Sequence, residues 1–563
     1  MDAQQFLAEF GHIANAPGGV GKLREMVYQL AITGTLTSQL NTDGDAHELL
    51  ADISKLREKL IREKAYKRQT KLEAEALNIP SAIRLPATWC WTRLLDLGEI
   101  SPRNDAPDEA DASFIPMSGF SEFHMGALVP EAEKWGHIKK GFTHFRNGDV
   151  VVAKITPCFE NGKAAVIDGL KHGIGAGTTE LHIFRPIHPG ILPRYIYLFL
   201  RSPYFALEGE KNMTGTAGQK RLPTEYFATR ALPLPPSTEQ ARIVAKVDEL
   251  MALCDKLETQ QQDRRKLQNK LRQSTLQAVA SATSPHELQT SWVRLAHNFG
   301  RLFHAPEDVR MLRDVIFDLA LKGAFLPGVT HADSADPIAD GTPPLPNDWR
   351  WKTLAELSEY ITSGSRGWKS YISNTGDSFI RSQDIKHDAL IFENPAFVVL
   401  PVKAEGMRTL VRQGDLLLTI TGGNVGKCAT VPELDQDAYV SQHVALIRLR
   451  EPWLAEFVHT WIINSFGGRQ FLERYIYGDK PGLNLSQVGS IPIPVPTQSA
   501  CIAILESLRT FRALCETLER QLMAKQGVAE ALVLAAVSGF TGIANEQEEP
   551  MQAPQIENAV ALT

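Results

Sequence analysis

Short apolar runs bounded by polar residues recur along the chain and predict β-strands. DVVVAKI at 149–155 and DLLLTIT at 415–421 are two such runs. Their length and their flanking polar residues favour buried strands. Longer stretches with apolar residues every three or four positions predict long helices at 236–283 and 497–541. The pattern therefore predicts a mixed α/β chain.

The order of elements occurs twice, which predicts two similar halves. Each half opens on a Trp-x-Trp segment, continues through short strands and ends in a proline-rich segment before a long helix. Proline at alternate positions forbids helix, so we expect an extended linker there. The matching segments are LPATWCWTRLLDLGEI at 85–100 with LPNDWRWKTLAELSEY at 345–360, RNGDVVVAKIT at 146–156 with RQGDLLLTIT at 412–421, TTELHIFR at 178–185 with SQHVALIR at 441–448, and LPLPPSTEQARI at 232–243 with IPIPVPTQSACI at 491–502.

Both long helices carry apolar residues at alternating steps of four and three, which is the period of a coiled coil. The two series share one offset along the chain, so we expect an antiparallel pair of helices in which the two series pack on each other. Two amphipathic helices that pack separately on their own domains are the alternative. The seam residues are Ile243, Val247, Leu250 and Leu257 in the first helix, and Ile504, Leu508, Phe511 and Leu518 in the second.

A shorter helical segment that ends in glycine frames these long helices. REMVYQLAITGTL at 24–36 matches RDVIFDLALKGAF at 313–325, and LVLAAVSGF at 532–540 and LQAVASA at 276–282 are related to both. Glycine after the last turn is typical of a helix C-terminus. This arrangement predicts that the two ends of the chain complete one half and the central pieces complete the other.

The predicted organisation has seven parts. Two globular domains alternate with helical segments, and a charged helix is expected at 53–77 as a contact with a partner subunit. The last segment has four acidic residues, no basic residue and no apolar period, which predicts disorder. The parts are an N-terminal helical region at 1–80, a first domain at 81–235, a spacer helix at 236–283, a helical connector at 284–340, a second domain at 341–496, a second spacer helix at 497–541 and the tail at 542–563.

Composition adds three limits. The 563 residues contain no apolar run long enough to span a membrane and no secretory signal, so we expect no membrane contact. The six cysteines form no CxxC pair, which favours free thiols in a reducing cytoplasm over disulfides or zinc. Residues 134–230 hold 14 Lys and Arg against 7 Asp and Glu, although the whole chain has a net charge of −6. A basic segment in an acidic chain favours DNA contact.

Together, the repeated Trp-x-Trp segment, the R-x-G-D strand, the PLPPSTEQ segment and the heptad helix resemble the specificity subunits of type I restriction-modification enzymes. The resemblance covers residues from about 20 to 540. The second copy departs from the motif, since Pro496-Thr497-Gln498-Ser499 replaces Ser237-Thr238-Glu239-Gln240, which puts any function of Glu239 in the second half in doubt.

This resemblance implies two target-recognition domains that each bind one half of a bipartite double-stranded DNA site. A spacer helix of about 40 residues is roughly 60 Å long, against about 34 Å for one turn of DNA. The resemblance also implies two adenine methyltransferase subunits that use S-adenosylmethionine, and motor-nuclease subunits that use ATP and magnesium. It implies no cofactor and no catalysis for this chain.

Loops rich in Arg, Lys, Asn and Gln are the candidates for DNA contact, because these side chains match the hydrogen-bonding edges of bases. Each candidate is also compatible with a phosphate contact or an ordinary exposed position. The candidates are Lys154, Asn161, Lys163, Gln219, Lys220 and Arg221 in the first domain, and Arg366, Lys369, Arg381, Gln383, Asn424, Lys427 and Lys480 in the second.

Motifs for catalysis are incomplete. TGGNVGK at 421–427 lacks the first glycine and the final Ser or Thr of a phosphate-binding loop. ENPAF at 393–397 has alanine at the third position of the Asn-Pro-Pro-aromatic motif of amino-methyltransferases. Asp149, Glu160 and Lys163 resemble a metal-dependent nuclease, but Asn424 replaces the glutamate in the second half. A duplicated scaffold that binds no DNA and an enzyme in its own right remain alternative hypotheses.

Overall fold

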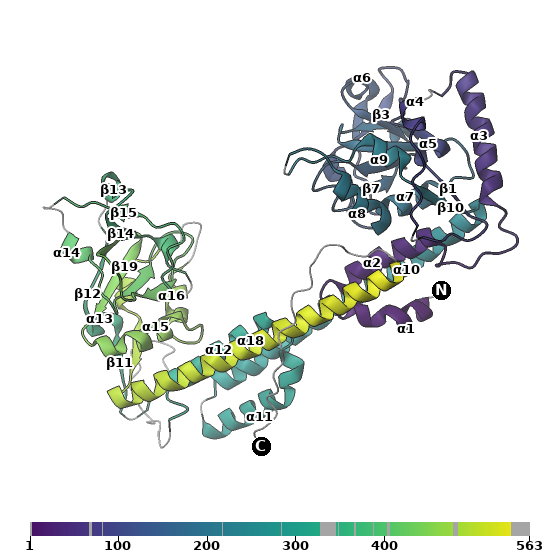
Figure 1. Cartoon of the computed structure of the whole chain (residues 1–563). Coiled ribbons are helices and arrows are strands. Elements are labelled where there is room, and N and C mark those ends of the chain that lie inside the picture. The colour runs from purple at the N-terminus through teal and green to yellow at the C-terminus, as the bar shows by residue number, and fades with distance from the viewer. Residues whose placement is uncertain are drawn as a thin grey trace. The chain divides into compact units, whose positions relative to one another are not determined.

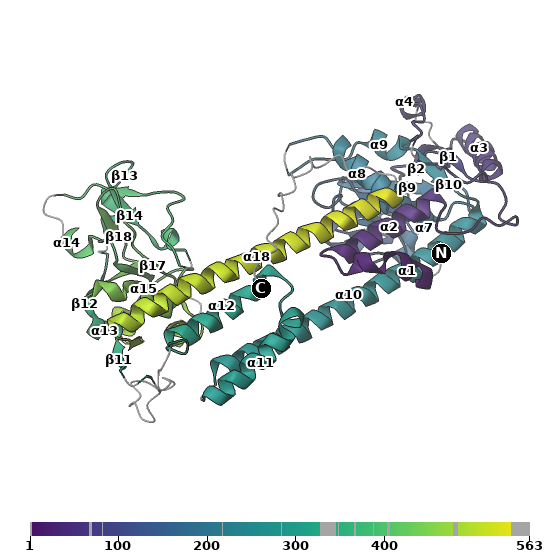
Figure 2. The same cartoon turned by 60° about the horizontal axis from the view of Figure 1, so that its bottom comes forward.

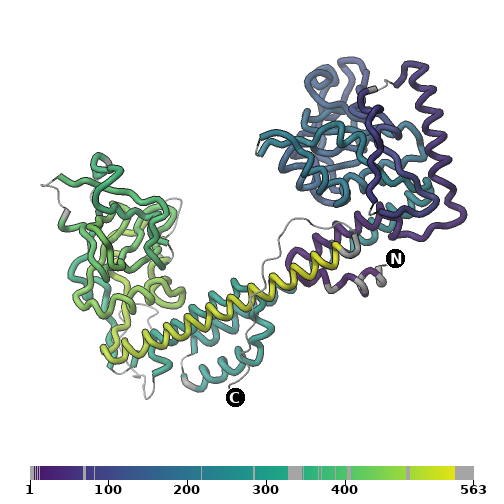
Figure 3. The backbone as a smooth tube through the Cα atoms, in the orientation of Figure 1, coloured from purple at the N-terminus to yellow at the C-terminus, as the bar shows by residue number. Residues whose placement is uncertain are grey.

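The computed structural model describes residues 3–66, 70–81, 83–216, 218–282, 284–326, 345–346, 348–364, 367–386, 388–401, 406–476 and 482–541. The chain divides into two compact units. Unit 1 holds the residues up to Asp263 and those from Gln526 onward, and unit 2 is Arg264–Lys525. Both described ends of the chain therefore lie in unit 1, as the purple and yellow ends of the tube show (Figure 3). The prediction that the two ends complete one half is confirmed.

Unit 1 contains two four-stranded sheets within its described residues. Its strands are β1 Cys90–Thr92, β2 Gly98–Ile100, β3 Asp111–Ile115, β4 Glu131–Lys134, β5 Thr143–Arg146, β6 Val150–Ala153, β7 Ala164–Val166, β8 Ile174–Gly177, β9 Leu181–Pro186 and β10 Leu232–Leu234. One sheet has the antiparallel order β2-β9-β6-β7. The other has the order β4-β3-β8-β5, with β3 and β8 parallel. The strands predicted in DVVVAKI and TTELHIFR are confirmed.

Helices surround these sheets and build the rest of unit 1. They are α1 Ala3–Ala14, α2 Gly19–Thr33, α3 Ala46–Arg62, α4 Thr70–Glu73, α5 Leu94–Leu97, α6 Trp135–Ile138, α7 Pro193–Arg201, α8 Pro203–Asn212, α9 Thr224–Thr229 and the first part of α10 Ser237–Ala280. Figure 1 shows α1 and α2 along α10, and all three contribute to one apolar cluster. The helix α2 ends at Thr33 and is capped by Gly34, whose φ of 73° suits glycine and confirms the predicted end.

Unit 2 repeats this architecture. Its strands are β11 Arg350–Thr353, β12 Ser358–Ser363, β13 Ile372–Ser373, β14 Asp377–Ile380, β15 Phe397–Val398, β16 Leu416–Thr419, β17 Cys428–Thr430, β18 Ala438–Val440, β19 Val444–Leu449 and β20 Pro492–Val495. Among the described residues, its two four-stranded sheets have the orders β12-β19-β16-β17 and β13-β15-β14-β18. The parallel pair β14–β18 corresponds to β3–β8 of unit 1. The strands predicted in DLLLTIT and SQHVALIR are confirmed.

The helices of unit 2 include a hairpin that packs on the end of α10. They are α11 Pro285–Leu302, α12 Pro306–Leu321, α13 Leu354–Leu357, α14 Gly406–Thr409, α15 Ala455–Ile463, α16 Arg469–Glu473, α17 Leu485–Gly489 and most of α18 Gln498–Thr541. Figure 2 shows α11 alongside the end of α10, where Leu295 and Leu276 share one cluster. The predicted helices at 276–282 and 532–540 are not separate elements, because α10 continues to Ala280 and α18 to Thr541.

The proline-rich segments are strands rather than free linkers. β10 pairs with the Trp-x-Trp strand β1, placing Pro233 opposite Trp91. In unit 2, β20 pairs with β11 in the same way, and Pro494 lies opposite Trp351. Each pair is a two-stranded sheet, whose outer side leaves room for residues that lack an N–H group.

This pairing corrects the alignment of the two proline-rich segments by two residues. Pro494, and not Pro492, corresponds to Pro233. When the corrected alignment is continued into the helices, Ala500 aligns with Glu239. The segment Gln498-Ser499-Ala500-Cys501 then corresponds to Ser237-Thr238-Glu239-Gln240. The burial pattern agrees, because Ile504 is buried like Ile243 while Ile502 is exposed.

The helices α10 and α18 contain 44 residues each, which confirms the two long helices. Their seam residues are buried or partly buried, but the two series belong to different apolar clusters. Ile243, Val247 and Leu250, with Leu257 packed against them, share a cluster with Val533 near the end of α18. Ile504 and Leu508, with Phe511 and Leu518 packed against them, share one with Leu276 near the end of α10. The expected packing of one series on the other was wrong, because an antiparallel pair sets the start of each helix against the end of its partner.

The charged segment at 53–77 is also not one helix. The helix α3 ends at Arg62, and Lys64 takes a left-handed backbone with φ of 59°. The Tyr66 hydroxyl donates a hydrogen bond of 2.8 Å to the Gly98 carbonyl, and Arg57 forms an ion pair with Glu73. The chain therefore turns back onto the first domain after α3.

No described helix is long and apolar enough to cross a membrane.

Candidate nucleic-acid interface

Two candidate loops of the first domain lie side by side. The loop Lys154–Lys163 follows β6, and the segment Gly215–Arg221 precedes α9. The Thr156 N–H donates to the Lys220 carbonyl at 3.1 Å, and the Lys220 N–H donates to the Thr156 hydroxyl at 3.2 Å. The Leu222 N–H donates to the Lys154 carbonyl at 2.7 Å. Residues far apart in the sequence thus form one polar surface.

The second domain builds the same junction. The loop at 421–427 follows β16, and Thr421 forms a β-bridge with Gly482, as Ile155 does with Arg221 in the first domain. The Gly364 N–H donates to the Ser441 carbonyl at 3.2 Å, which brings the start of the 363–370 segment to the same edge. Both copies of the repeat therefore give one arrangement of loops.

Several candidates in the first domain already have partners within it. Arg221 forms an ion pair of 2.8 Å with Glu180, and the Asn161 amide donates to Glu122 at 3.0 Å. The Lys163 ammonium donates to the Met117 carbonyl at 3.2 Å. These contacts fix the loops and use part of the hydrogen-bonding capacity of each side chain.

Three other candidates have free polar ends. Gln219 and Lys220 are exposed and Lys154 is half-buried. None of the three side chains donates a hydrogen bond to another described residue. They are the candidates of the first domain that DNA can meet without rearrangement.

In the second domain, the described candidates lie in two loops that contact each other. Arg381 forms an ion pair of 3.0 Å with Asp384, and Gln383 is exposed beside it. The Asn424 amide donates to the Ser382 carbonyl at 3.0 Å, and Lys427 donates to Asn424 at 2.8 Å. The loops at 381–384 and 421–427 are therefore joined. Arg366, Lys480 and the side chain of Lys369 lie outside the described residues.

Sequence reasoning missed one arginine contact in each domain. The Arg201 guanidinium, at the end of α7, donates to the carbonyl of Gly162. Arg469 of α16 donates likewise to the carbonyl of Gly426. These glycines have φ of 69° and 82° and precede Lys163 and Lys427. The two arginines lie at different distances along the chain from their glycines, so the repeat did not reveal them.

The R-x-G-D motif forms a structural ion pair. Asp149 is 1% exposed and binds the Arg185 guanidinium through both carboxylate oxygens, at 2.8 Å each. Asp149 also accepts the Arg146 N–H at 2.8 Å, which closes the turn before β6. Asp415 and Arg448 repeat this pair at 2.6 Å. Asp149 is therefore engaged in the fold, and no group of three potential metal ligands occurs among the described residues.

A buried histidine holds the second candidate segment in place. His182 of β9 contacts the Leu222 carbonyl at 2.8 Å and stacks on the Phe227 ring at 4.8 Å between centroids. Burial lowers the pKa of His182 to about 4, so the ring is neutral near pH 7. Because the carbonyl only accepts, the facing nitrogen carries the proton and donates.

Known proteins resemble the chain over most of its length. Residues 86–264 match the family described as the type I restriction modification DNA specificity domain. The chain is 30% identical to the type I restriction enzyme EcoEI specificity subunit of Escherichia coli, over 92% of this chain and 94% of that protein. It is 31% identical to the EcoAI specificity subunit of Escherichia coli, with the same coverage.

Solved structures show a weaker likeness. A chain from a structure of type I R-M complex assembly and conformational transition is 18% identical, with a TM-score of 0.45, over 81% of this chain and 98% of that chain. The HsdS subunit from Thermoanaerobacter tengcongensis is 19% identical, with a TM-score of 0.39, over 82% of this chain and 99% of that chain. The family assignment therefore rests on the sequence relatives. The chain belongs to the specificity subunits of type I restriction enzymes, the non-catalytic subunits that carry the DNA specificity of these enzymes.

Proposed function

We propose that this chain binds a bipartite double-stranded DNA target, with one half-site read by the domain at 81–235 and the other by the domain at 341–496. The observation that carries the proposal is the duplicated loop junction. The bridge between Ile155 and Arg221 recurs between Thr421 and Gly482, each beside a polar loop that follows a buried strand. Two equivalent surfaces with different side chains suit two different half-sites.

The partners in this proposal are two methyltransferase subunits and the motor-nuclease subunits of a type I enzyme. S-adenosylmethionine, ATP and magnesium are then used by those partners, and this chain binds no cofactor itself. Exposed apolar side chains on α18, among them Leu514, Met523 and Leu532, support docking of a partner protein on the long helices.

Exchange of residues 85–235 for the matching segment of another specificity subunit tests the proposal. The hybrid chain, expressed with its partner subunits, is expected to move adenine methylation to a site with one new half and one unchanged half. Sequencing that detects methylated adenine gives the readout. Methylation that follows the original target, despite a stable hybrid complex, contradicts the proposal and favours the scaffold hypothesis.

A further inference from the structure

His124 lies where three elements of unit 1 meet. Its Nε2 contacts the Asp248 carboxylate of α10 at 3.0 Å, and its Nδ1 contacts the Tyr28 hydroxyl of α2 at 3.0 Å. A carboxylate only accepts, so Nε2 carries the proton and Nδ1 of the neutral ring accepts from Tyr28. Burial lowers the pKa of His124, which keeps the ring in this neutral form. One side chain thus joins a loop of the recognition domain to two helices.

The candidate reading loop Lys154–Lys163 reaches this histidine by two routes. In the first, Asn161 donates to Glu122 at 3.0 Å, two residues before His124 in the same turn. In the second, Arg201 donates to the Gly162 carbonyl and lies over the Tyr28 ring at 5.5 Å. Both routes start in the reading loop and converge on the Tyr28–His124 contact.

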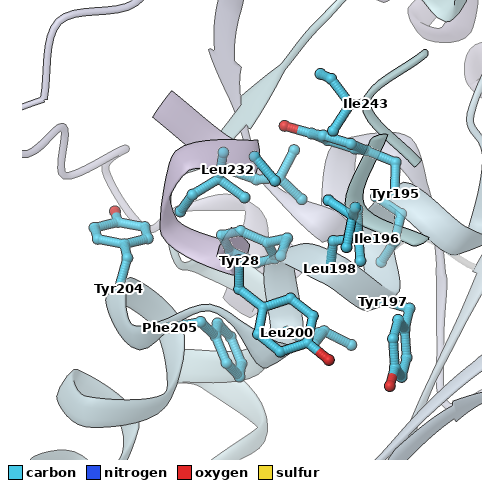
Figure 4. Packing of buried hydrophobic residues seen from close by; sticks show 14 of the residues in the cluster. Tyr28, Tyr195, Ile196, Tyr197, Leu198, Leu200, Tyr204, Phe205, Leu232 and Ile243 are labelled. Carbon is cyan, nitrogen blue, oxygen red and sulfur yellow. The ribbon is translucent and has the colours of Figure 1, made fainter. Parts of the chain in front are cut away.

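The turn that carries His124 is fixed on both sides. Met125 has a left-handed backbone with φ of 47°, which is uncommon outside glycine. Its N–H donates to the Tyr197 hydroxyl at 3.1 Å. Figure 4 shows the hydroxyls of Tyr28 and Tyr197 directed to the same side of the cluster. Phe123 of the same turn points outward, and it is 78% exposed.

Among its described residues, the second half has no counterpart of the Tyr28–His124 contact. In the aligned helices, Phe317 stands where Tyr28 stands, so the hydroxyl that binds His124 has no counterpart. Arg469 holds the Gly426 carbonyl as Arg201 holds Gly162, but its other contact is an ion pair of 3.1 Å with Glu473 of its own helix. The second domain is joined to its helices by other residues, since the Asn464 amide donates to the Asp314 carbonyl of α12 at 2.8 Å.

We propose that His124 is a positioning residue for DNA discrimination by the first domain. Through Tyr28, Glu122 and Arg201 it fixes the reading loop against α2 and α10. This inference rests on the proposed function, because it assigns the domain at 81–235 one half-site. Loss of the Tyr28–His124 contact is then expected to relax recognition of that half-site and to leave the other half-site unchanged.

The test uses the full chain in complex with its methyltransferase subunits and duplexes that contain the mapped target. Affinity is measured for the intact target and for single base-pair changes in each half. Tyr28→Phe removes one hydroxyl and gives this position the residue of the second half. His124→Ala removes both contacts, and Tyr28→Phe still decides the question if that chain does not fold. Both variants are expected to lower discrimination in the first half by about fivefold to tenfold, which is typical of one lost buried hydrogen bond, and to change the second half by less than about twofold.

Phe123→Ala is the matched control, because its side chain is exposed on the same turn and belongs to neither route. It is expected to bind DNA with unchanged discrimination. A purely structural effect of Tyr28→Phe would lower the melting temperature or the bound fraction, without a change confined to one half. Equal losses in both halves, no loss in either, or a loss caused by Phe123→Ala overturns the inference. Failure of the proposed function shows instead in the unmodified complex, as an absence of half-site discrimination.

Discussion

The indole N–H of Trp89 donates a hydrogen bond of 2.8 Å to the carboxylate of Glu239, and both residues are buried. The same carboxylate accepts from the Thr37 hydroxyl and the Gln39 amide at 2.9 Å each. The residue before β1, the start of α10 and the segment after α2 therefore meet at one acidic side chain. This contact explains why the Trp and PSTEQ motifs occur together in the first half.

Glu239→Ala is expected to destabilise unit 1 by about 2–3 kcal/mol, because the buried Trp89 indole N–H and the half-buried Thr37 hydroxyl lose their acceptor. Urea unfolding of the full chain, followed by Trp fluorescence, measures the effect. Glu249→Ala is the control, since Glu249 pairs with Lys246 on the exposed side of the same helix; it is expected to cost less than about 1 kcal/mol. Equal losses in the two variants would contradict this reading of Glu239.

Asp318 predicts a pH dependence for unit 2. It is 0% exposed on α12, one of its oxygens has no hydrogen-bond partner among the described residues, and Lys322 pairs with the other. Burial raises the pKa of Asp318 from 3.8 to about 6. The folded state therefore binds a proton more readily than the unfolded state, and this group lowers stability increasingly as pH rises from about 4 to 6. A rise of this size corresponds to about 3 kcal/mol at pH 8.

Asp318→Asn is expected to raise the melting temperature at pH 8 and to have a smaller effect at pH 4.5. The aligned residue of unit 1 is Gln29, which is buried and uncharged. Differential scanning calorimetry at the two pH values gives the comparison. Glu530→Gln, on an exposed part of α18, is expected to change stability little at either pH. A gain from Asp318→Asn that is equal at both pH values would show that ionisation of Asp318 is not the cause.

The buried pair of Asp149 and Arg185 is expected to matter more than exposed pairs of the same type. Asp149→Ala leaves a buried guanidinium without its partner, which costs about 3–5 kcal/mol. Chemical denaturation of the full chain measures the loss. Asp111→Ala breaks the exposed pair with Lys134 in the same domain and is expected to change stability little, because solvent screens exposed pairs. A similar cost for both would contradict the structural function assigned to the R-x-G-D motif.

Lys220 is expected to contact a DNA phosphate, because its side chain is exposed and flexible and its ammonium has no hydrogen-bond partner among the described residues. Lys220→Ala should weaken binding to cognate and unrelated duplexes alike. It should also lower the slope of log affinity against log salt by about one. Lys55→Ala, which removes an exposed lysine paired with Asp52 on α3, is the control and should leave the slope unchanged. A loss confined to one base pair would instead assign Lys220 to base reading.

Apolar period was sufficient to predict the strands β6, β9, β16 and β19 and both long helices, because burial on these elements follows local spacing. It was insufficient for the proline-rich segments. Pro492, Pro494 and Pro496 alternate, so a shift of two residues preserves the pattern, and only the pairing of Pro494 with Trp351 fixes the register. The prediction that the two apolar series of the long helices pack on each other was wrong for a related reason. A shared period does not show which part of one helix packs on which part of the other.

The candidate site was predicted at the level of loops rather than side chains. The loops at 154–163 and 215–221 were both chosen for polar residues, and backbone bonds at Thr156 and Lys220 join them. Sequence could not show that Arg221 forms an ion pair with Glu180, because that contact depends on where β9 begins. Nor could the sequence show that Arg201, at the end of α7, donates a hydrogen bond to the carbonyl of Gly162, because the fold brings these two segments together.

The presence of both described ends of the chain in unit 1 has a consequence for synthesis on the ribosome. Val533, Ala536 and Val537 of α18 pack in the same cluster as Phe10 of α1 and Leu23 of α2. Unit 2 has its complete set of residues once Lys525 has left the exit tunnel, whereas unit 1 needs the final turns of α18. A prematurely terminated chain therefore contains a finished second unit and a first unit with an uncovered apolar surface, which chaperones and proteases recognise.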